Sequence, residues 1–112
     1  MGDFVYVYDG FNDGITKKEL KLLMHMISYL DEEYNCLKYN GEFLTQGKIA
    51  ELFGENEKVV KSGINSLCKK GKLAVINCGF RQMIVVNPYI ASKSNNMAKL
   101  VLELFGSDKI DD

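Results

Sequence analysis

The sequence predicts an α+β fold in a single domain, on three observations. Apolar residues recur at helical spacing in four stretches of the chain. Two β-branched runs, separated by a glycine-containing turn, lie between the third and fourth of these stretches, and another β-branched and aromatic run opens the chain. The 112 residues, 46% of them hydrophobic, fit one domain with a buried core. We expect a single domain over residues 1–112, with a core over 3–93, a C-terminal helix over 95–105 and an acidic tail over 106–112.

The stretch from Thr45 to Lys72 predicts two short helices joined by a tight turn. Thr45 and Asn56 can each cap the start of a helix, and Gly54 suits the left-handed position that often ends one. Both helices carry an apolar stripe at helical spacing, formed by Ile49, Leu52 and Phe53 in the first and by Val60, Ile64 and Leu67 in the second. Such a pair is typical of a helix-turn-helix. The second helix would be the recognition helix, with its outward positions at Lys58, Lys61, Ser62, Asn65 and Lys69.

The flanking segments extend this motif. Thr16 can cap a first long helix from about Lys17 to Glu33, and Asn40-Gly41 is a tight-turn signal. Residues 73–76 and 82–86 predict two strands of a hairpin around a turn at 77–79. Three helices followed by a hairpin is the order of a winged helix-turn-helix, a three-helix core with a β-hairpin wing. An N-terminal strand over 4–8 and an amphipathic C-terminal helix are added to it, the latter with an apolar stripe formed by Met97, Leu100, Val101, Leu104 and Phe105.

Charge is unevenly distributed along the chain, although the net charge is only −1. Residues 1–43 hold four lysines and eight acids, a balance of −4. Residues 44–93 hold eight basic and three acidic side chains, a balance of +5, and residues 94–112 carry −2. The positive charge therefore coincides with the predicted helix-turn-helix and hairpin, as expected of a local phosphate-binding face.

Catalytic and metal-binding patterns are missing from the sequence. A metal-dependent nickase needs clustered histidines, and the chain has one, His25. No GxxxxGK[ST] phosphate-binding loop occurs, and the three cysteines and His25 lack CxxC or CxxxH spacing. We therefore expect no enzyme activity, no metal and no cofactor. The irregularly spaced cysteines are typical of free thiols in a reducing cytoplasm, and no apolar run approaches the roughly 20 residues of a membrane span. We expect a cytoplasmic protein without a membrane partner.

Three stretches of this chain resemble RepL-type plasmid replication proteins: the opening FVYVYDGF, the predicted helix-turn-helix around Thr45–Lys70, and MIVVNPYIASKS, which ends the hairpin. The resemblance covers residues 4–105. It implies a winged-helix domain that binds double-stranded DNA at a specific sequence and starts plasmid or phage replication with host replication proteins. By the family pattern the major-groove residues would be Lys58, Lys61, Ser62 and Asn65, and 80–82 would form the wing tip. Glu55 and Glu57 lie at the start of the recognition helix, where many DNA-reading helices carry small or basic residues instead.

The candidate DNA-binding residues lie on the two helices and the wing. They are Thr45, Gln46, Lys58, Lys61, Ser62, Asn65, Lys69, Arg81 and Gln82. An asparagine such as Asn65 can pair with adenine in the major groove, and lysines can contact phosphates. The same residues leave two alternatives open, a transcriptional regulator and a winged-helix protein–protein docking module that does not bind DNA. A homodimer through the C-terminal helix would suit a palindromic DNA site.

Overall fold

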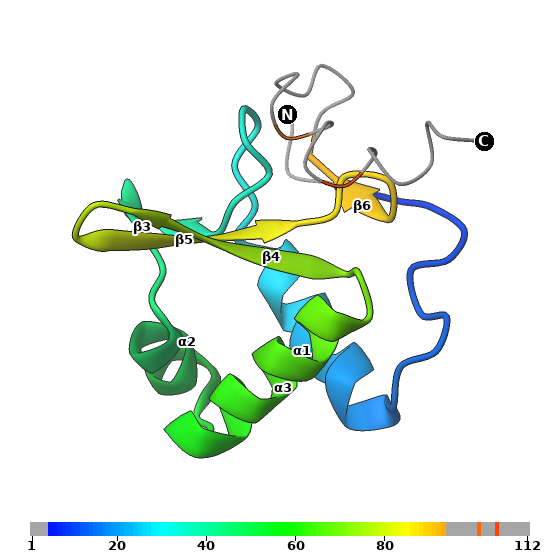
Figure 1. The fold of residues 1–112 in the computed structure, drawn as a ribbon, viewed down its shortest axis with the longest axis horizontal. Coiled ribbons are helices and arrows are strands. Elements are labelled where there is room, and N and C mark those ends of the chain that lie inside the picture. Colours follow the sequence, from blue (N-terminus) through cyan, green and yellow to red (C-terminus); the bar gives the residue numbers. More distant parts are fainter. Residues whose placement is uncertain (1–4, 94–100, 102–104, 106–112) are drawn as a thin grey trace.

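The computed structural model describes residues 5–93, 101 and 105, and within them it has three helices and three small antiparallel sheets (Figure 1). The elements are β1 (Tyr6–Val7), α1 (Lys17–Ile27), β2 (Lys38–Tyr39), β3 (Glu42–Phe43), α2 (Gln46–Phe53), α3 (Glu57–Lys69), β4 (Leu73–Cys78), β5 (Arg81–Val86) and β6 (Ala91–Ser92). The sheets pair β1 with β6, β2 with β3 and β4 with β5. The helices pack together on one side of the β4–β5 hairpin. The predicted α+β class is confirmed.

Helix α1 begins as predicted. The Thr16 hydroxyl accepts a hydrogen bond from the Glu19 backbone N–H at 3.2 Å, and the Glu19 carboxylate accepts one from the Thr16 N–H at 2.9 Å. This reciprocal pair is a capping box, which satisfies two N–H groups that have no partner inside the helix.

The predicted end of α1 at Glu33 is wrong, because the helix ends at Ile27. The Ser28 hydroxyl donates to the carbonyl of His25 at 2.6 Å, and the Tyr29 N–H donates to Met26, three residues back. Leu30 then leaves the helix and pairs in a β-bridge with Leu37, where it is still buried. The apolar spacing predicted too long a helix, because Leu30 reaches the core from a β-bridge rather than from another helical turn.

The two helices and the tight turn predicted for 45–72 are confirmed. The Thr45 hydroxyl accepts from the Lys48 N–H at 3.1 Å and starts α2. Gly54 ends α2 with a φ of +67°, a left-handed conformation that costs glycine little. Asn56 accepts from the Lys58 N–H at 2.8 Å and starts α3.

The core lies where α3 packs against α1 and α2. Val60, Ile64 and Leu67 of α3 are fully buried. They share one hydrophobic cluster with Leu23, Ile27, Ile49 and Leu52, as the apolar stripes predict. Gly63 allows α1 and α3 to approach closely, since a Cβ at that position would lie 2.7 Å from a methyl carbon of Leu22.

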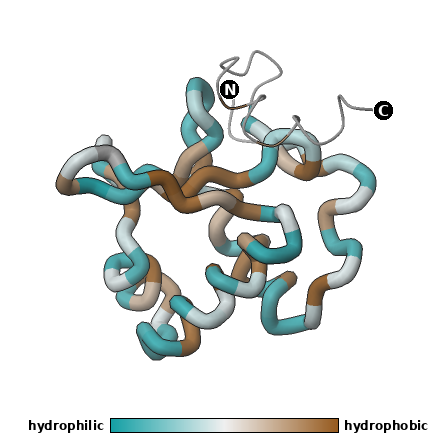
Figure 2. The backbone as a smooth tube through the Cα atoms, viewed as in Figure 1, coloured by the Kyte–Doolittle hydropathy of each residue, from teal (hydrophilic) through white to brown (hydrophobic). Residues whose placement is uncertain are grey.

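The β4–β5 hairpin is longer than predicted. Asn77, expected in the turn, pairs with Gln82 across the ladder, and only Gly79 and Phe80 form the turn. Gly79 has a φ of +65°, which the first turn residue of a type II′ hairpin requires. Figure 2 shows hydrophobic residues gathered along the middle of this hairpin, and Ile84, Val85 and Val86 of β5 are fully buried.

Asn35 joins β5 to β6. Its side chain is fully buried, and its amide group donates to the carbonyls of Val86 and Ala91, both at 2.8 Å. The backbone carbonyl of Asn35 accepts the Val86 N–H at 2.9 Å. Asn35 has a φ of +57°, in the left-handed region that asparagine tolerates better than most residues.

Two residues of the predicted C-terminal stripe are described. Val101 and Phe105 are both helical, and they pack against Cys36 and Val85 of the same chain. Met97, Leu100 and Leu104 lie outside the described residues, so the homodimer stays a prediction. None of the helices in the described part of the chain is long and apolar enough to cross a membrane.

Ile64 tests the packing of α3. Replacing Ile64 by Ala is expected to lower the free energy of unfolding by about 2–5 kcal/mol, because a fully buried side chain is lost where three helices meet. Val59, on the same helix but 49% exposed, is the matched control. Val59→Ala should change the free energy of unfolding by less than about 0.5 kcal/mol, and urea denaturation measures both variants. Equal, small effects of the two changes would contradict this core.

Candidate nucleic-acid interface

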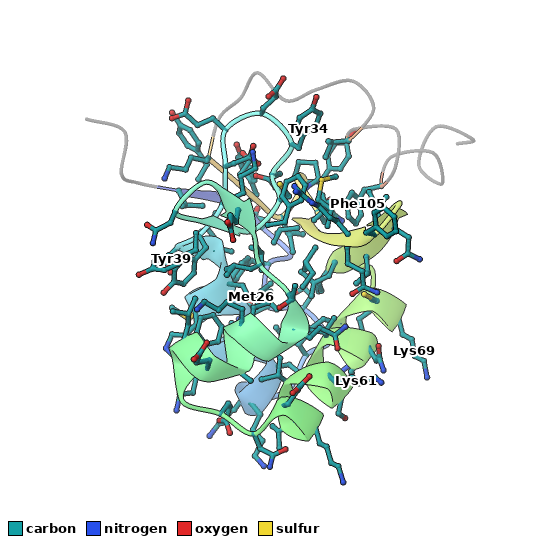
Figure 3. The ribbon with its side chains drawn as sticks, turned by 90° about the vertical axis from the view of Figure 1, so that its left-hand side faces the viewer. Met26, Tyr34, Tyr39, Lys61, Lys69 and Phe105 are labelled. Carbon is teal, nitrogen blue, oxygen red and sulfur yellow. The ribbon has the colours of Figure 1, made fainter. Side chains whose placement is uncertain are left out.

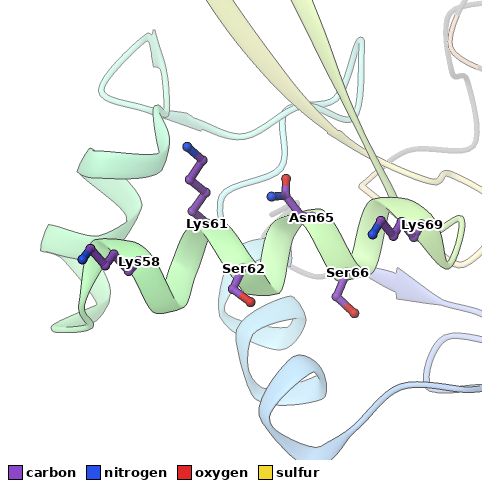
Figure 4. Close-up of a pocket in the computed structure, with 6 residues that line it drawn as sticks. All are labelled: Lys58, Lys61, Ser62, Asn65, Ser66 and Lys69. Carbon is purple, nitrogen blue, oxygen red and sulfur yellow. The ribbon is translucent and has the colours of Figure 1, made fainter.

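The outer side of α3 gathers five of the predicted site residues. Because Val60, Ile64 and Leu67 face the core, the opposite side of the helix is left to polar residues. This side, the α3 face, consists of Lys58, Lys61, Ser62, Asn65 and Lys69, which are all exposed. Together with Ser66 they line one shallow depression (Figure 4).

The side chains of the α3 face point in distinct directions. In Figure 4, Lys61 and Asn65 point to one side of the helix axis, whereas Ser62 and Ser66 point to the other. Lys61 and Asn65 are four residues apart and so lie one helical turn from each other. A ligand that lies along α3 could therefore meet a cation and an amide side by side.

The lysines of the α3 face are electrostatically available. The ion pairs among the described residues involve Lys38, Lys48 and Lys70, and none involves a lysine of the α3 face. Lys72, which also contributes to the positive segment, is buried and donates to the carbonyl of Gly10. Within residues 44–93, the exposed basic side chains outside these ion pairs are thus the α3-face lysines and Arg81; Lys17, Lys18 and Lys21 of α1 are exposed as well.

Ser66, which the sequence did not single out, belongs to the contact between α3 and α1. Its hydroxyl donates to one carboxylate oxygen of Glu19, and the Lys70 ammonium lies 2.7 Å from the other oxygen. These hydrogen bonds from Lys70 and Ser66 lower the pKa of Glu19 from 4.5 to about 2. Ser66 and Lys70 therefore have partners within the fold, although Ser66 also lines the depression of the α3 face.

Glu57, which departs from the pattern of many DNA readers, lies close to α2. A Cβ built on Gly47, in the first turn of α2, would lie 3.5 Å from a carboxylate oxygen of Glu57. The partial positive charge at the start of a helix favours a carboxylate in this position. Glu55 is exposed, and its backbone N–H donates to the carbonyl of Ala50 at 2.9 Å.

A second depression brings the hairpin next to the start of α2. It is lined by Glu42, Phe43, Thr45, Asn77, Gly79, Phe80, Arg81 and Gln82. Thr45, Arg81 and Gln82 of the predicted set therefore share one hollow. Gln46 is half-buried and lines neither depression.

The α3 face and the hairpin lie on the same side of the molecule. In Figure 3, Lys61 and Lys69 point to the right, which is also the side of the yellow-green β4–β5 hairpin, whereas Tyr39 lies on the left. The two depressions share no lining residue. The structure thus separates the predicted residues into two neighbouring groups, one on α3 and one between the hairpin and α2.

Thiol and metal chemistry find little support in the described residues. Burial, and the nearby Asp31 carboxylate, raise the pKa of Cys36 to about 12, and burial raises the pKa of Cys68. Both thiols are therefore poor nucleophiles at neutral pH. In the part of the chain that is described, no group of three or more His, Cys, Asp or Glu residues could hold a metal ion.

No protein-family model, curated protein or solved structure matches this chain. The resemblance to RepL-type proteins consequently stays a prediction.

The ion pair of Glu19 makes stability depend on acid pH. Because the folded-state pKa of Glu19 is about 2 against an ordinary 4.5, its contribution is fully present above about pH 4.5 and is lost as the pH falls towards 2. Glu19→Gln should therefore lower the free energy of unfolding at pH 7, and its deficit relative to the unmodified protein should shrink between pH 4.5 and 2. Urea denaturation across this range measures the deficit. Glu32→Gln, at an exposed position, is the control and should show no such trend. A deficit of Glu19→Gln that is constant with pH would argue against the ion pair.

Proposed function

We propose that this domain is a winged helix that binds double-stranded DNA at a specific sequence, with α3 as the recognition helix and β4–β5 as the wing. The observation that carries the proposal is the α3 face, where Lys58, Lys61 and Lys69 flank Asn65 on the exposed side of a helix whose other side is fully packed. The order of three helices followed by a hairpin supports it, as does the common side that α3 and the hairpin occupy.

The major groove of DNA is about 12 Å wide and admits a helix with its side chains. With α3 in that groove, the lysines of the α3 face contact phosphates, and Asn65 is free to pair with the N6 and N7 atoms of an adenine. Ser62 is also exposed but points away from Lys61 and Asn65, and it adds a hydroxyl that can hydrogen-bond either a base or a phosphate. The lysine contacts with phosphates hold the helix in place, whereas the contact between Asn65 and adenine selects the DNA sequence.

The second depression supplies the contacts beside α3. Thr45 of this depression meets the phosphate backbone together with Gln46, which follows it in the chain but lies outside the depression. The positive end of the α2 dipole favours that approach. Arg81 and Gln82 of the wing reach the neighbouring phosphates or the minor groove. The Glu57 carboxylate lies close to the start of α2 and competes with phosphate there, so it limits non-specific affinity.

We further propose that the DNA role is that of a RepL-like initiator of plasmid or phage replication. This rests on the resemblance of the opening strand, the two helices and the MIVVNPYIASKS segment. Such a protein marks the origin and leaves strand opening and synthesis to host replication proteins. It therefore needs no catalytic residue, metal or cofactor of its own. A transcriptional regulator would use the same DNA contacts and differ in the position of its site.

Selection of bound sequences from random duplex DNA tests sequence-specific binding, and Lys61 tests the phosphate contacts. Lys61→Ala should weaken binding to the recovered site and to an unrelated duplex by similar factors, and lower the slope of log affinity against log salt by about 1. Lys21 is also exposed but lies on α1, outside the α3 face, so Lys21→Ala is the charge-matched control and should leave the slope unchanged. If no sequence is recovered and no duplex binds at low salt, the docking module is the better reading.

Asn65 tests sequence reading separately. Asn65→Ala should cost about 1–3 kcal/mol of binding free energy on the recovered site, because the paired adenine loses its hydrogen bonds. Affinity for an unrelated duplex, measured by fluorescence anisotropy in the same buffer, should stay the same. An equal loss on both duplexes would mean that Asn65 contacts the backbone rather than a base.

A further inference from the structure

The tip of the β4–β5 hairpin carries an aromatic residue that the fold does not use. Phe80 has a relative exposure of 108%, the highest among the large hydrophobic residues that the structure describes. The turn itself depends on Gly79, whose positive φ no bulky residue adopts easily. Phe80 therefore contributes neither to the core nor to the geometry of the turn.

The hairpin holds Phe80 in a fixed position. All six residues of β4 pair with β5, from Leu73 opposite Val86 to Cys78 opposite Arg81. The inner end of the ladder is anchored in the core through Ile84 and Val86. A six-residue strand spans about 20 Å, so the tip is carried away from this anchor. In Figure 1 the tip lies at the left-hand edge of the molecule, beyond α2.

The neighbours of Phe80 are suited to nucleic acid. Arg81 follows it directly, and both line the second depression together with the polar side chains of Asn77 and Gln82. An arginine beside an aromatic ring offers a cation for phosphate and a flat apolar surface for a base. The tip is also on the side of the molecule to which Lys61 and Lys69 point.

We propose that Phe80 is a wedge that enters the minor groove, partly unstacks one base step and bends the duplex. This inference rests on the proposed DNA binding by α3 and deepens it. Apolar side chains inserted between base steps kink DNA by about 20–90° towards the major groove. That bend brings the duplex closer to α3, and Arg81 neutralises the phosphates beside the inserted ring. Pyrimidine–purine steps unstack most easily, so such a step is the expected point of insertion.

The experiment measures binding and bending on the same DNA. The probe is a duplex of about 30 base pairs that carries the sequence recovered by selection, with a fluorophore at each end. Anisotropy reports binding, energy transfer between the two ends reports the bend, and permanganate reports thymines that have lost their stacking. With the unmodified protein, binding should raise energy transfer and make thymines at one step reactive.

Phe80→Ala is the decisive variant and Phe80→Leu its conservative counterpart. Phe80→Ala should still bind, but energy transfer should return to the value of free DNA and the reactive thymines should disappear. Phe80→Leu should keep part of both signals, since leucine also serves as a wedge. Thermal unfolding should be the same for all three proteins, because the ring is fully exposed.

Two results would overturn the wedge while leaving DNA binding intact. One is binding by the unmodified protein without a bend or reactive thymines. The other is a bend that Phe80→Ala retains, which would assign the distortion to α3. If the unmodified protein binds no duplex, the proposed function is overturned as well. The exposed ring of Phe80 would then be a contact site for another protein.

Discussion

Helix α3 buries one of its sides between α1 and α2, and this packing sets the positions of the other elements. Val60, Ile64 and Leu67 occupy the centre of the core, and both other helices close on them. Because a helix has a fixed period of 3.6 residues, burying these positions also determines which side chains point outward. The exposed α3 face is therefore a consequence of the core, and a shift in one would displace the other.

A second constraint joins the hairpin to β6 and, through it, to the N-terminal strand. The fully buried amide group of Asn35 donates to the carbonyls of Val86 and Ala91, so it joins the end of β5 to β6. Its Oδ1 atom is buried and has no hydrogen-bond partner among the residues that the structure describes. Strand β6 in turn pairs with β1, which links residues near the two ends of the described chain. The Asn35 side chain thus joins two strands directly, and β1 follows through its pairing with β6. Val86 is at the end of β5 farthest from Phe80, so this contact positions the inner end of the hairpin.

Long-range contacts decide where the positive charge is available. Lys70 is neutralised by Glu19, 51 residues earlier, and Lys72 donates to Gly10, 62 residues earlier. Lys48 is paired with Glu51 within α2. The balance of +5 in residues 44–93 therefore becomes a smaller, directed charge, carried by the α3 face and Arg81. Such local positive charge would favour the proposed phosphate contacts even though the net charge of the chain is −1.

Features that depend on near neighbours could be predicted from the amino-acid sequence alone. The caps at Thr45 and Asn56, the left-handed Gly54 and the buried stripe of α3 involve residues within about one or two turns, so their spacing was sufficient to predict them. The tertiary structure decided the rest. Helix α1 ends at Ile27 because Leu30 pairs with Leu37 instead of extending the helix. Glu57 lies near α2, Ser66 is hydrogen-bonded to Glu19, and Phe80 is exposed at the hairpin tip. These three features depend on which distant segments meet, and local residue spacing does not predict those contacts.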